Sequence, residues 1–373
     1  MAGQKGLLIS AGEPSGDLHA AALVRDLRTL LPEVELLGFG GDRMAQAGVH
    51  LVHHQREAHA VIGFQEALQN VGRLYDIYRD LVRLARQRAA LAILVDYPGF
   101  HLRLARRLHD AGIPVVYYIL PQFWSWGYRR LRSLRRNVAL ALSILPFEMP
   151  YLKAYGVPAH YVGHPLMDQM GPPVRRRQLP RDPVIAFLPG SRHTEVRRLL
   201  PRMARLAEHL KRWGYRRFLV SKAPDVQVNP QDWLPEAQVV PGNAETIARQ
   251  ADFAVVASGT ASLEVGLVGV PMVVVYVLSD LSYWLARALA RVRYISLVNL
   301  ISGRPVVPEY VQHLKPEPLA RRIHEILSSE EQYLAMHRQL LSLREHLGPP
   351  GASRRAAQHI AALYRQVVNS PRV

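Results

Sequence analysis

Asp96 directly follows the apolar run Leu91–Val95 and precedes the turn-forming residues Tyr97-Pro98-Gly99. A carboxylate at the end of a buried parallel strand lies where doubly wound sheets bind ligands, and partial burial raises its pKa toward that of a general base. We therefore predict that Asp96 accepts a proton from a sugar hydroxyl. Two alternatives stay open: Asp96 caps a helix or closes a turn, or His101 is the base.

A second acidic segment, Ala11–Asp17, separates a predicted strand, Gly6–Ser10, from a predicted helix, Leu18–Leu30. Its two glycines allow a tight turn and a close approach of backbone to ligand. The segment matches neither the P-loop nor the GxGxxG pattern. Because its two carboxylates would repel phosphate, a hydroxyl-rich or cationic ligand is expected here. In the alternative interpretation, Asp17 only caps the helix.

Two later segments each place a small, polar turn between a strand and a helix. Turn amides, hydroxyls and an arginine fork at such a place can neutralise a pyrophosphate without a metal. The residues that we expect to bind a nucleoside diphosphate are Gly190, Ser191, Arg192, Ser258, Gly259, Thr260 and Glu264. Glu264, one turn into its helix, could hold both ribose hydroxyls. The alternative is plain helix capping, by Thr194 in the first segment.

Three polar residues, Asn299, Glu309 and Gln312, stand among apolar neighbours near the end of the second half of the chain. We expect them to read sugar hydroxyls. Metal and nucleophile patterns are missing from the sequence: it contains no cysteine, no Asp-x-Asp, no HExxH and no GxSxG. We therefore expect neither a metal nor another cofactor.

Apolar runs of four to seven residues alternate with segments of helical period along the whole chain. Such alternation of Val/Ile/Leu-rich strands with helices predicts parallel sheets covered on both faces. We predict an α/β protein with two doubly wound, Rossmann-like domains, residues 1–170 and 183–349, facing a central cleft that would hold the active site. A proline-rich linker, 171–183, separates them, and the C-terminal helix, about 350–373, could pack back on the first domain.

The chain has 373 residues and carries 47 Lys and Arg against 30 Asp and Glu, a formal net charge of +17. This excess points to an anionic partner. The segment Phe123–Arg136 combines four aromatic residues with five arginines, and within it Trp124, Trp126, Arg129 and Arg130 are candidate membrane contacts. A core aromatic cluster followed by a solvated helix would give the same pattern, and nucleic acid is a further candidate partner. No stretch reaches the length of a membrane-spanning helix, and the N-terminus lacks a signal-peptide pattern.

Taken in order, these motifs resemble those of the lipid-A-disaccharide synthase family, bacterial glycosyltransferases with the two-domain GT-B architecture. The resemblance runs over nearly the whole chain. The segments that carry it are Ala11–Asp17, Ala60–Leu68, Val95–Phe100, Leu145–Glu148, Gly163-His164, Leu188–Arg192, Ser258–Glu264 and Leu297–Gly303.

The resemblance implies transfer of a diacylated glucosamine from UDP to lipid X, a phosphorylated glycolipid, with a new β-1,6 linkage and inversion at the anomeric carbon. It implies no metal and work at the cytoplasmic face of the inner membrane. The net charge adds an anionic membrane surface as a partner, and no recognition motif supports nucleic acid. The C-terminal helices could also pack against a second copy in a homodimer. Asp96 matches the family's presumed base, Arg192 its diphosphate-binding arginine and Glu264 its ribose-binding glutamate. The remaining positions, expected to bind acceptor or sugar, are Glu13, Ser15, Gly16, Asn299 and Gln312.

The sequence departs from the family pattern at Gly99, in the segment Leu120–Trp126, and at Val275-Tyr276-Val277. These departures concern the acceptor more than the fold or the UDP site. Two alternatives remain: another UDP-sugar enzyme on the same fold, such as a UDP-N-acetylglucosamine epimerase or an enzyme with a different lipid acceptor, and a non-enzymatic nucleic-acid-binding protein. The concentration of arginines around Trp124 favours the lipid enzyme over the epimerase.

Overall fold

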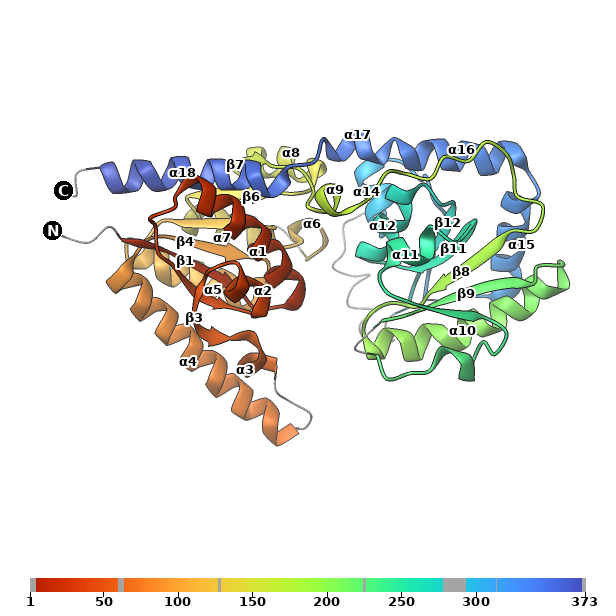
Figure 1. The fold of residues 1–373 in the computed structure, drawn as a ribbon, viewed down its shortest axis with the longest axis horizontal. Helices are drawn as coiled ribbons and strands as arrows, with labels where there is room; N and C mark the ends of the chain where they lie inside the picture. Colours follow the sequence, from red (N-terminus) through yellow and green to blue (C-terminus); the bar gives the residue numbers. More distant parts are fainter. Residues whose placement is uncertain are drawn as a thin grey trace. The chain divides into compact units, whose positions relative to one another are not determined.

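The computed structural model describes residues 5–59, 64–126, 129–223, 226–277, 293–312 and 314–370, without the side chains of residues 58–71 and 125–128 (Figure 1). The chain forms two compact units, each with its own sheet. Unit 1 comprises Met1–Asp168 and Pro349–Val373, and unit 2 comprises Gln169–Gly348. No helix within the described ranges is long and apolar enough to cross a membrane.

Unit 1 is built on a parallel sheet of seven strands in the order β3-β2-β1-β4-β5-β6-β7. Its strands are β1 (Gly6–Ala11), β2 (Leu36–Gly40), β3 (His50–His54), β4 (Ala89–Val95), β5 (Val115–Tyr118), β6 (Leu140–Ser143) and β7 (Ala159–Tyr161). Its helices are α1 (Pro14–Leu30), α2 (Asp42–Gln46), α3 (Gln55–His59), α4 (Phe64–Arg88), α5 (Pro98–Asp110), α6 (Phe123–Trp126), α7 (Arg129–Asn137), η1 (Pro146–Glu148), α8 (Met149–Ala154) and α18 (Ala352–Asn369), with α9 (Leu166–Gln169) at the unit boundary.

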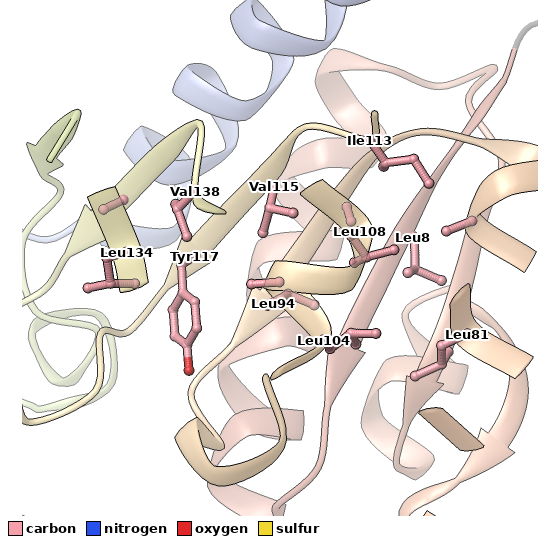
Figure 2. Close-up of a cluster of buried hydrophobic side chains, with 14 of the residues drawn as sticks. Leu8, Leu81, Leu94, Leu104, Leu108, Ile113, Val115, Tyr117, Leu134 and Val138 are labelled. Carbon is pink, nitrogen blue, oxygen red and sulfur yellow. The ribbon is translucent and has the colours of Figure 1, made fainter. Parts of the chain in front are cut away.

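Helices cover both faces of this sheet, which explains why its inner strands are mostly apolar. On one face α18 packs against α1 (Figure 1), and the Tyr364 hydroxyl donates to the carbonyl of Lys5 at 2.7 Å. On the other face α4, α5 and α7 enclose a core into which Leu8, Leu94 and Tyr117 project from the strands (Figure 2). The apolar period of α4 and α5 therefore reflects core packing.

Unit 2 repeats the design with a parallel sheet of six strands in the order β10-β9-β8-β11-β12-β13. Its strands are β8 (Val184–Leu188), β9 (Arg217–Lys222), β10 (Gln238–Pro241), β11 (Phe253–Ala257), β12 (Met272–Tyr276) and β13 (Glu309–Val311). Its helices are α10 (His193–Arg212), η2 (Pro230–Asp232), α11 (Ala244–Ala248), α12 (Thr260–Val268), α14 (Leu297–Ser302), α15 (Pro316–Leu327), α16 (Glu330–Leu341) and α17 (Leu343–Leu347).

The strand orders define one topological switch point in each sheet, where successive connections leave in opposite directions. In unit 1 it lies between β1 and β4, and in unit 2 between β8 and β11. Ligands of doubly wound sheets bind beyond the carboxyl ends of the strands at such points. Each of the four strands is followed by one of the motifs that the sequence singles out. The two predicted doubly wound sheets are therefore confirmed, and the topology explains the motif positions.

Three edge strands, β3, β7 and β13, are missing from the sequence-based prediction. They are three to five residues long and only partly buried, so the apolar run that reveals an inner strand is absent. The predicted linker also differs from a free connection, because it binds unit 2 along its length. Arg176 pairs with Asp252, and the Val174 N–H donates to the carbonyl of Val268 at 2.9 Å.

Candidate functional site

Asp96 is the first residue after β4, and the structure gives it an unusual backbone. Its N–H donates to the carbonyl of Tyr118 at 3.0 Å, which extends the sheet by one bond. Asp96 and Tyr97 then adopt left-handed conformations, with φ of 51° and 49°. Tyr97 occupies the N-cap position of α5, and no side chain caps this helix. The alternative in which Asp96 caps the helix is therefore wrong.

The surroundings of the Asp96 carboxyl make it a weaker acid than an exposed aspartate. Burial, and secondarily the charge of Glu13, raise its pKa to about 6, while the backbone N–H of Tyr97 opposes this shift. A carboxyl with this pKa is mostly ionised at neutral pH and still basic enough to take a proton in a transition state. The geometry and electrostatics therefore suit a general base.

His101, the alternative base, lies one turn into α5 and is completely buried. Its Nδ1 is 2.7 Å from the carbonyl oxygen of Asp96 and its Nε2 is 2.8 Å from the hydroxyl of Ser10. Burial lowers the pKa of the imidazole to about 4. Because both ring nitrogens are engaged and no ring atom is exposed, His101 is not placed to take a proton from a substrate.

The segment after β1 lies beside Asp96, although it differs from the predicted loop. Helix α1 begins at Pro14, with Glu13 as its N-cap residue, so Ser15 and Gly16 belong to its first turn. The Tyr97 ring covers Gly12 so closely that a Cβ there would lie 2.2 Å from the ring. Ser15 is exposed and Gly16 is buried, near the β4 carbonyl of Val95. The structure therefore brings Glu13 and Asp96 together.

Asp17 has a structural function that the sequence alone does not reveal. Its carboxylate accepts the backbone N–H groups of Gly41, Arg43 and Met44 at 2.8–3.1 Å. N–H groups at the start of a helix have no acceptor within that helix. Asp17 therefore caps α2, although it is far from α2 in the sequence. The interpretation of Asp17 as a cap for its own helix is wrong, because α1 starts three residues earlier.

In unit 2 the turn after β8 offers backbone and an arginine to a ligand. Gly190 has φ of 108°, a conformation that favours glycine, and Arg192 is the N-cap residue of α10 with a side chain 78% exposed. The Arg192 guanidinium lies 3.6 Å from the carboxylate of Glu195. Thr194 is the second helical residue and does not occupy the cap. This turn therefore presents an arginine to the solvent beside a helix start.

The turn after β11 lies next to the first one. A Cβ on Gly190 would be 3.7 Å from the Cβ of Ala257, the last residue of β11. Ser258, Gly259 and Thr260 follow, and Gly259 has φ of 146°. Two neighbouring helix starts, α10 and α12, therefore meet the switch point, which favours an anion there.

Glu264 lies in the second turn of α12 and is half-buried. Burial raises the pKa of its carboxyl, while backbone hydrogen bonds from Glu245 and Ala244 oppose the shift. The carboxylate is thus fixed beside the start of α11. A fixed acceptor of this kind can bind a pair of vicinal hydroxyls.

Asn299 occupies a different environment from the one predicted. It is 1% exposed, and its Nδ2 donates to the Val307 carbonyl and to Glu309, each at 2.8 Å. Its Oδ1 accepts the N–H groups of Val306 and Val307 at 2.8 and 3.0 Å. With two donors and two acceptor sites used, no capacity remains for a sugar.

Glu309 is likewise engaged by the protein, because its carboxylate accepts the N–H groups of Ile295 and Ser296 at 2.9 Å. The prediction that Asn299 and Glu309 read sugar hydroxyls therefore needs correction: they hold the chain between β12 and β13. Gln312 follows β13 directly with φ of 62° and remains a candidate. Among the residues that the structure describes, no three acidic or histidine side chains gather as in a metal site.

Trp124 is bound by unit 1 and does not stand free on its surface. Its indole N–H donates to Glu148 at 3.2 Å, and its ring packs edge-on against Phe147. These contacts favour the aromatic-cluster alternative, in which the preceding Phe123 is core. Trp124 itself is partly exposed, and its assignment as a membrane contact stays a prediction. Arg129 is exposed and Arg130 half-buried at the start of α7. The Trp126 side chain lies outside the described residues, as do residues 60–63 and the side chains of residues 64–68 in the segment Ala60–Leu68.

The fold is shared with enzymes that use activated sugars. The calicheamicin glycosyltransferase CalG4 matches 99% of this chain and all of its own with a TM-score of 0.60 and 14% identity. A UDP-GlcNAc 2-epimerase from Neisseria meningitidis, solved with UDP-GlcNAc, covers 95% of this chain and 99% of its own with a TM-score of 0.59 and 9% identity. These likenesses assign the chain to the GT-B fold class, in agreement with its two parallel Rossmann-like sheets.

Sequence similarity is more specific. The family model described as lipid-A-disaccharide synthetase matches residues 7–362. The lipid-A-disaccharide synthases of Myxococcus xanthus and Nitrosococcus oceani are 40% and 35% identical to this chain, covering 96% and 95% of it and 97% and 95% of their own lengths. The chain belongs to the lipid-A-disaccharide synthase family, which confirms the resemblance noted from the motifs.

Proposed function

We propose that this protein transfers 2,3-diacylglucosamine from its UDP derivative to lipid X, 2,3-diacylglucosamine 1-phosphate, and releases UDP. The product is the β-1,6-linked lipid A disaccharide 1-phosphate. The observation that carries the proposal is a buried carboxylate, Asp96, with a pKa near 6 at a switch point of the sheet, in a chain of this family.

Asp96 is the general base in this mechanism. As the acceptor hydroxyl oxygen attacks the anomeric carbon of the donor, its proton passes to the Asp96 carboxylate. The new carbon–oxygen bond forms on the side opposite the departing UDP, so the configuration inverts. The bond between the anomeric carbon and the β-phosphate oxygen breaks, and its electron pair leaves with UDP.

The turns after β8 and β11 supply the electrostatic stabilisation that the leaving group needs. Arg192 and the neighbouring helix starts of α10 and α12 bind the diphosphate, and they stabilise the charge that develops on it. Gly190, Ser191, Ser258, Gly259 and Thr260 provide turn amides and hydroxyls. Glu264 holds the ribose hydroxyls.

On the acceptor side, Glu13 and Ser15 lie within two residues of each other at the start of α1, and Glu13 is coupled electrostatically to Asp96. We assign them, with Gln312, to hydroxyl groups of the sugars. Gly16 serves packing at the same place. Acylated substrates reside in a membrane, so the enzyme works at the cytoplasmic face of the inner membrane, where the net charge of +17 and Arg129 favour an anionic surface.

The direct test is incubation of the purified protein with UDP-diacylglucosamine and lipid X, with mass spectrometry for the disaccharide. Turnover that persists in a strong chelator is expected. Asp96→Asn should lower kcat by about 10²–10⁴-fold, the range of general-base catalysis, while UDP binding persists. The matched control is Asp110→Asn, a half-exposed aspartate on α5, which should leave turnover unchanged. Wild-type protein that forms no disaccharide would refute the proposal.

A further inference from the structure

The peptide carbonyl of Asp96 accepts two side-chain hydrogen bonds. The oxygen lies 2.7 Å from His101 Nδ1 and 2.8 Å from the hydroxyl of Tyr117. The N–H of the same residue is bound to the carbonyl of Tyr118. Both peptide groups that flank the Asp96 side chain are therefore held, one by the sheet and the other by side chains from α5 and β5.

The hydrogen-bond chain assigns the tautomer of His101. A carbonyl oxygen only accepts, so Nδ1 must carry the ring proton, and Nε2 then accepts from the Ser10 hydroxyl. The ring is neutral at physiological pH because burial lowers its pKa to about 4. Ser10 and His101 look like a nucleophile and its base, but neither has any exposed surface. The Ser10 hydroxyl therefore cannot attack a substrate. Its hydrogen bond can only orient the imidazole ring of His101.

The backbone that this chain of bonds secures is strained. Asp96 and Tyr97 are consecutive non-glycine residues with left-handed φ, a conformation that persists only where the surroundings enforce it. Pro98 disfavours the right-handed helical region for Tyr97. The position of the Asp96 carboxylate depends on this turn, because the Tyr97 N–H, which belongs to the same peptide group as the Asp96 carbonyl, donates to that carboxylate.

We propose that Tyr117 and His101 are positioning residues that aim the Asp96 carboxylate at the acceptor hydroxyl, and that Ser10 keeps His101 in the tautomer required. This inference rests on the proposed function, in which Asp96 is the base. The three residues come from β5, α5 and β1, so the packed sheet itself fixes the base. Tyr117 and His101 donate to the backbone carbonyl of Asp96 and not to its carboxylate, so they are not catalytic residues.

The test uses Tyr117→Phe, which removes one donor and keeps the ring in the core. The chain offers a matched control at the next position: Tyr118 is equally buried, and its hydroxyl has no hydrogen-bond partner among the described residues. Tyr117→Phe should lower kcat by at least about tenfold with little change in KM, because misplacement of a catalytic group by about 1 Å costs up to about 10²-fold. Tyr118→Phe should keep kcat within about twofold of wild type, since it removes no hydrogen bond.

A second measurement follows the carboxyl itself and needs no substrate. The ¹³C-carboxyl resonance of Asp96, identified by its loss in Asp96→Asn, should titrate with a midpoint near 6 in the wild type. The charged and titratable groups around it are Glu13, Tyr97, His101, Tyr117 and, beside Tyr117, Arg130. Release of the backbone should let the carboxylate turn toward solvent, so Tyr117→Phe should lower the midpoint and Tyr118→Phe should not.

Ser10→Ala and a pair of His101 variants complete the series. His101→Asn can still donate a hydrogen bond from near the Nδ1 position, so it should retain a higher kcat than His101→Leu. If His101 only filled space, the kcat values of the two variants would not follow this order. An unchanged carboxyl midpoint in Tyr117→Phe, or equal losses in Tyr117→Phe and Tyr118→Phe, would overturn the inference. Absence of disaccharide formation by the wild type would instead refute the proposed function, and the titration would still decide whether Tyr117 positions Asp96.

Discussion

Replacement of Glu148 by glutamine should make the stability of the protein less dependent on pH. Glu148 ends η1 in unit 1 and is 1% exposed. Its carboxyl accepts the Ser143 hydroxyl at 2.6 Å and the Trp124 indole N–H at 3.2 Å. These hydrogen bonds favour the ionised form, but burial outweighs them and raises the pKa from 4.5 to about 7.

The sign of the effect follows from the direction of this shift. Because the folded-state pKa lies above the unfolded one, the folded protein binds the proton more tightly. The resulting stabilisation is complete below the unfolded pKa of 4.5 and is lost as the pH rises through about 7. Each pKa unit corresponds to about 1.4 kcal/mol, so the total is about 3 kcal/mol, most of it between about pH 5 and 8.

The assay is urea unfolding followed by circular dichroism at several pH values between about 5 and 8, for the wild type and Glu148→Gln. The free energy of unfolding of the variant relative to wild type should rise by roughly 2–3 kcal/mol across this range, because glutamine carries no titrating proton. Glu33→Gln, at an exposed position of the same unit, is the control and should show no such trend. A difference between wild type and Glu148→Gln that stays constant with pH would show that burial does not perturb Glu148 as argued.

Three further outcomes are expected. The value of kcat/KM should fall about tenfold from pH 7 to pH 5, because the Asp96 carboxylate becomes protonated around pH 6. Glu13→Gln should move this acidic limb of the pH–rate profile to lower pH. An acidic limb near pH 4 in the wild type would contradict the assignment of Asp96 as the base. Glu264→Gln should weaken UDP binding by about 1–3 kcal/mol in a calorimetric titration if it holds the ribose, and an unchanged Kd would remove it from the site. Asn299→Ala should lower the free energy of unfolding by about 2 kcal/mol or more, because it leaves buried N–H groups unpaired; thermal unfolding like that of the wild type would show that its four hydrogen bonds contribute little.

The inner strands and the long helices could be predicted from the sequence because their signals are local. An inner strand of a parallel sheet is apolar along its whole length, and a helix on its face repeats every 3.6 residues. β1 begins at the predicted residue, Gly6, and β4 ends at the last residue of the predicted apolar run, Val95. The edge strands β3, β7 and β13 carry no such run, since one side lacks a neighbour, and only pairing reveals them.

The candidate site divides in the same way. Asp96, Arg192 and Glu264 could be selected from the sequence because each follows a readable strand, and parallel strands deliver such residues to one edge of a sheet. Nothing in the sequence distinguishes Asn299 from these three residues. Its actual partners are backbone groups brought to it by folding, and a sequence does not show whether a polar side chain will be saturated by the protein.

The sequence by itself determined the order of the inner strands and long helices, the family, and the chemical types gathered at the switch points, since each depends on neighbours along the chain. The tertiary structure alone decided what individual polar groups do. Asp17 caps a helix 24 to 27 residues away, and His101 is oriented by Ser10, 91 residues distant. These roles depend on hydrogen bonds formed in a buried environment, where an unpaired group is costly, and burial is a property that only the packed sheet creates.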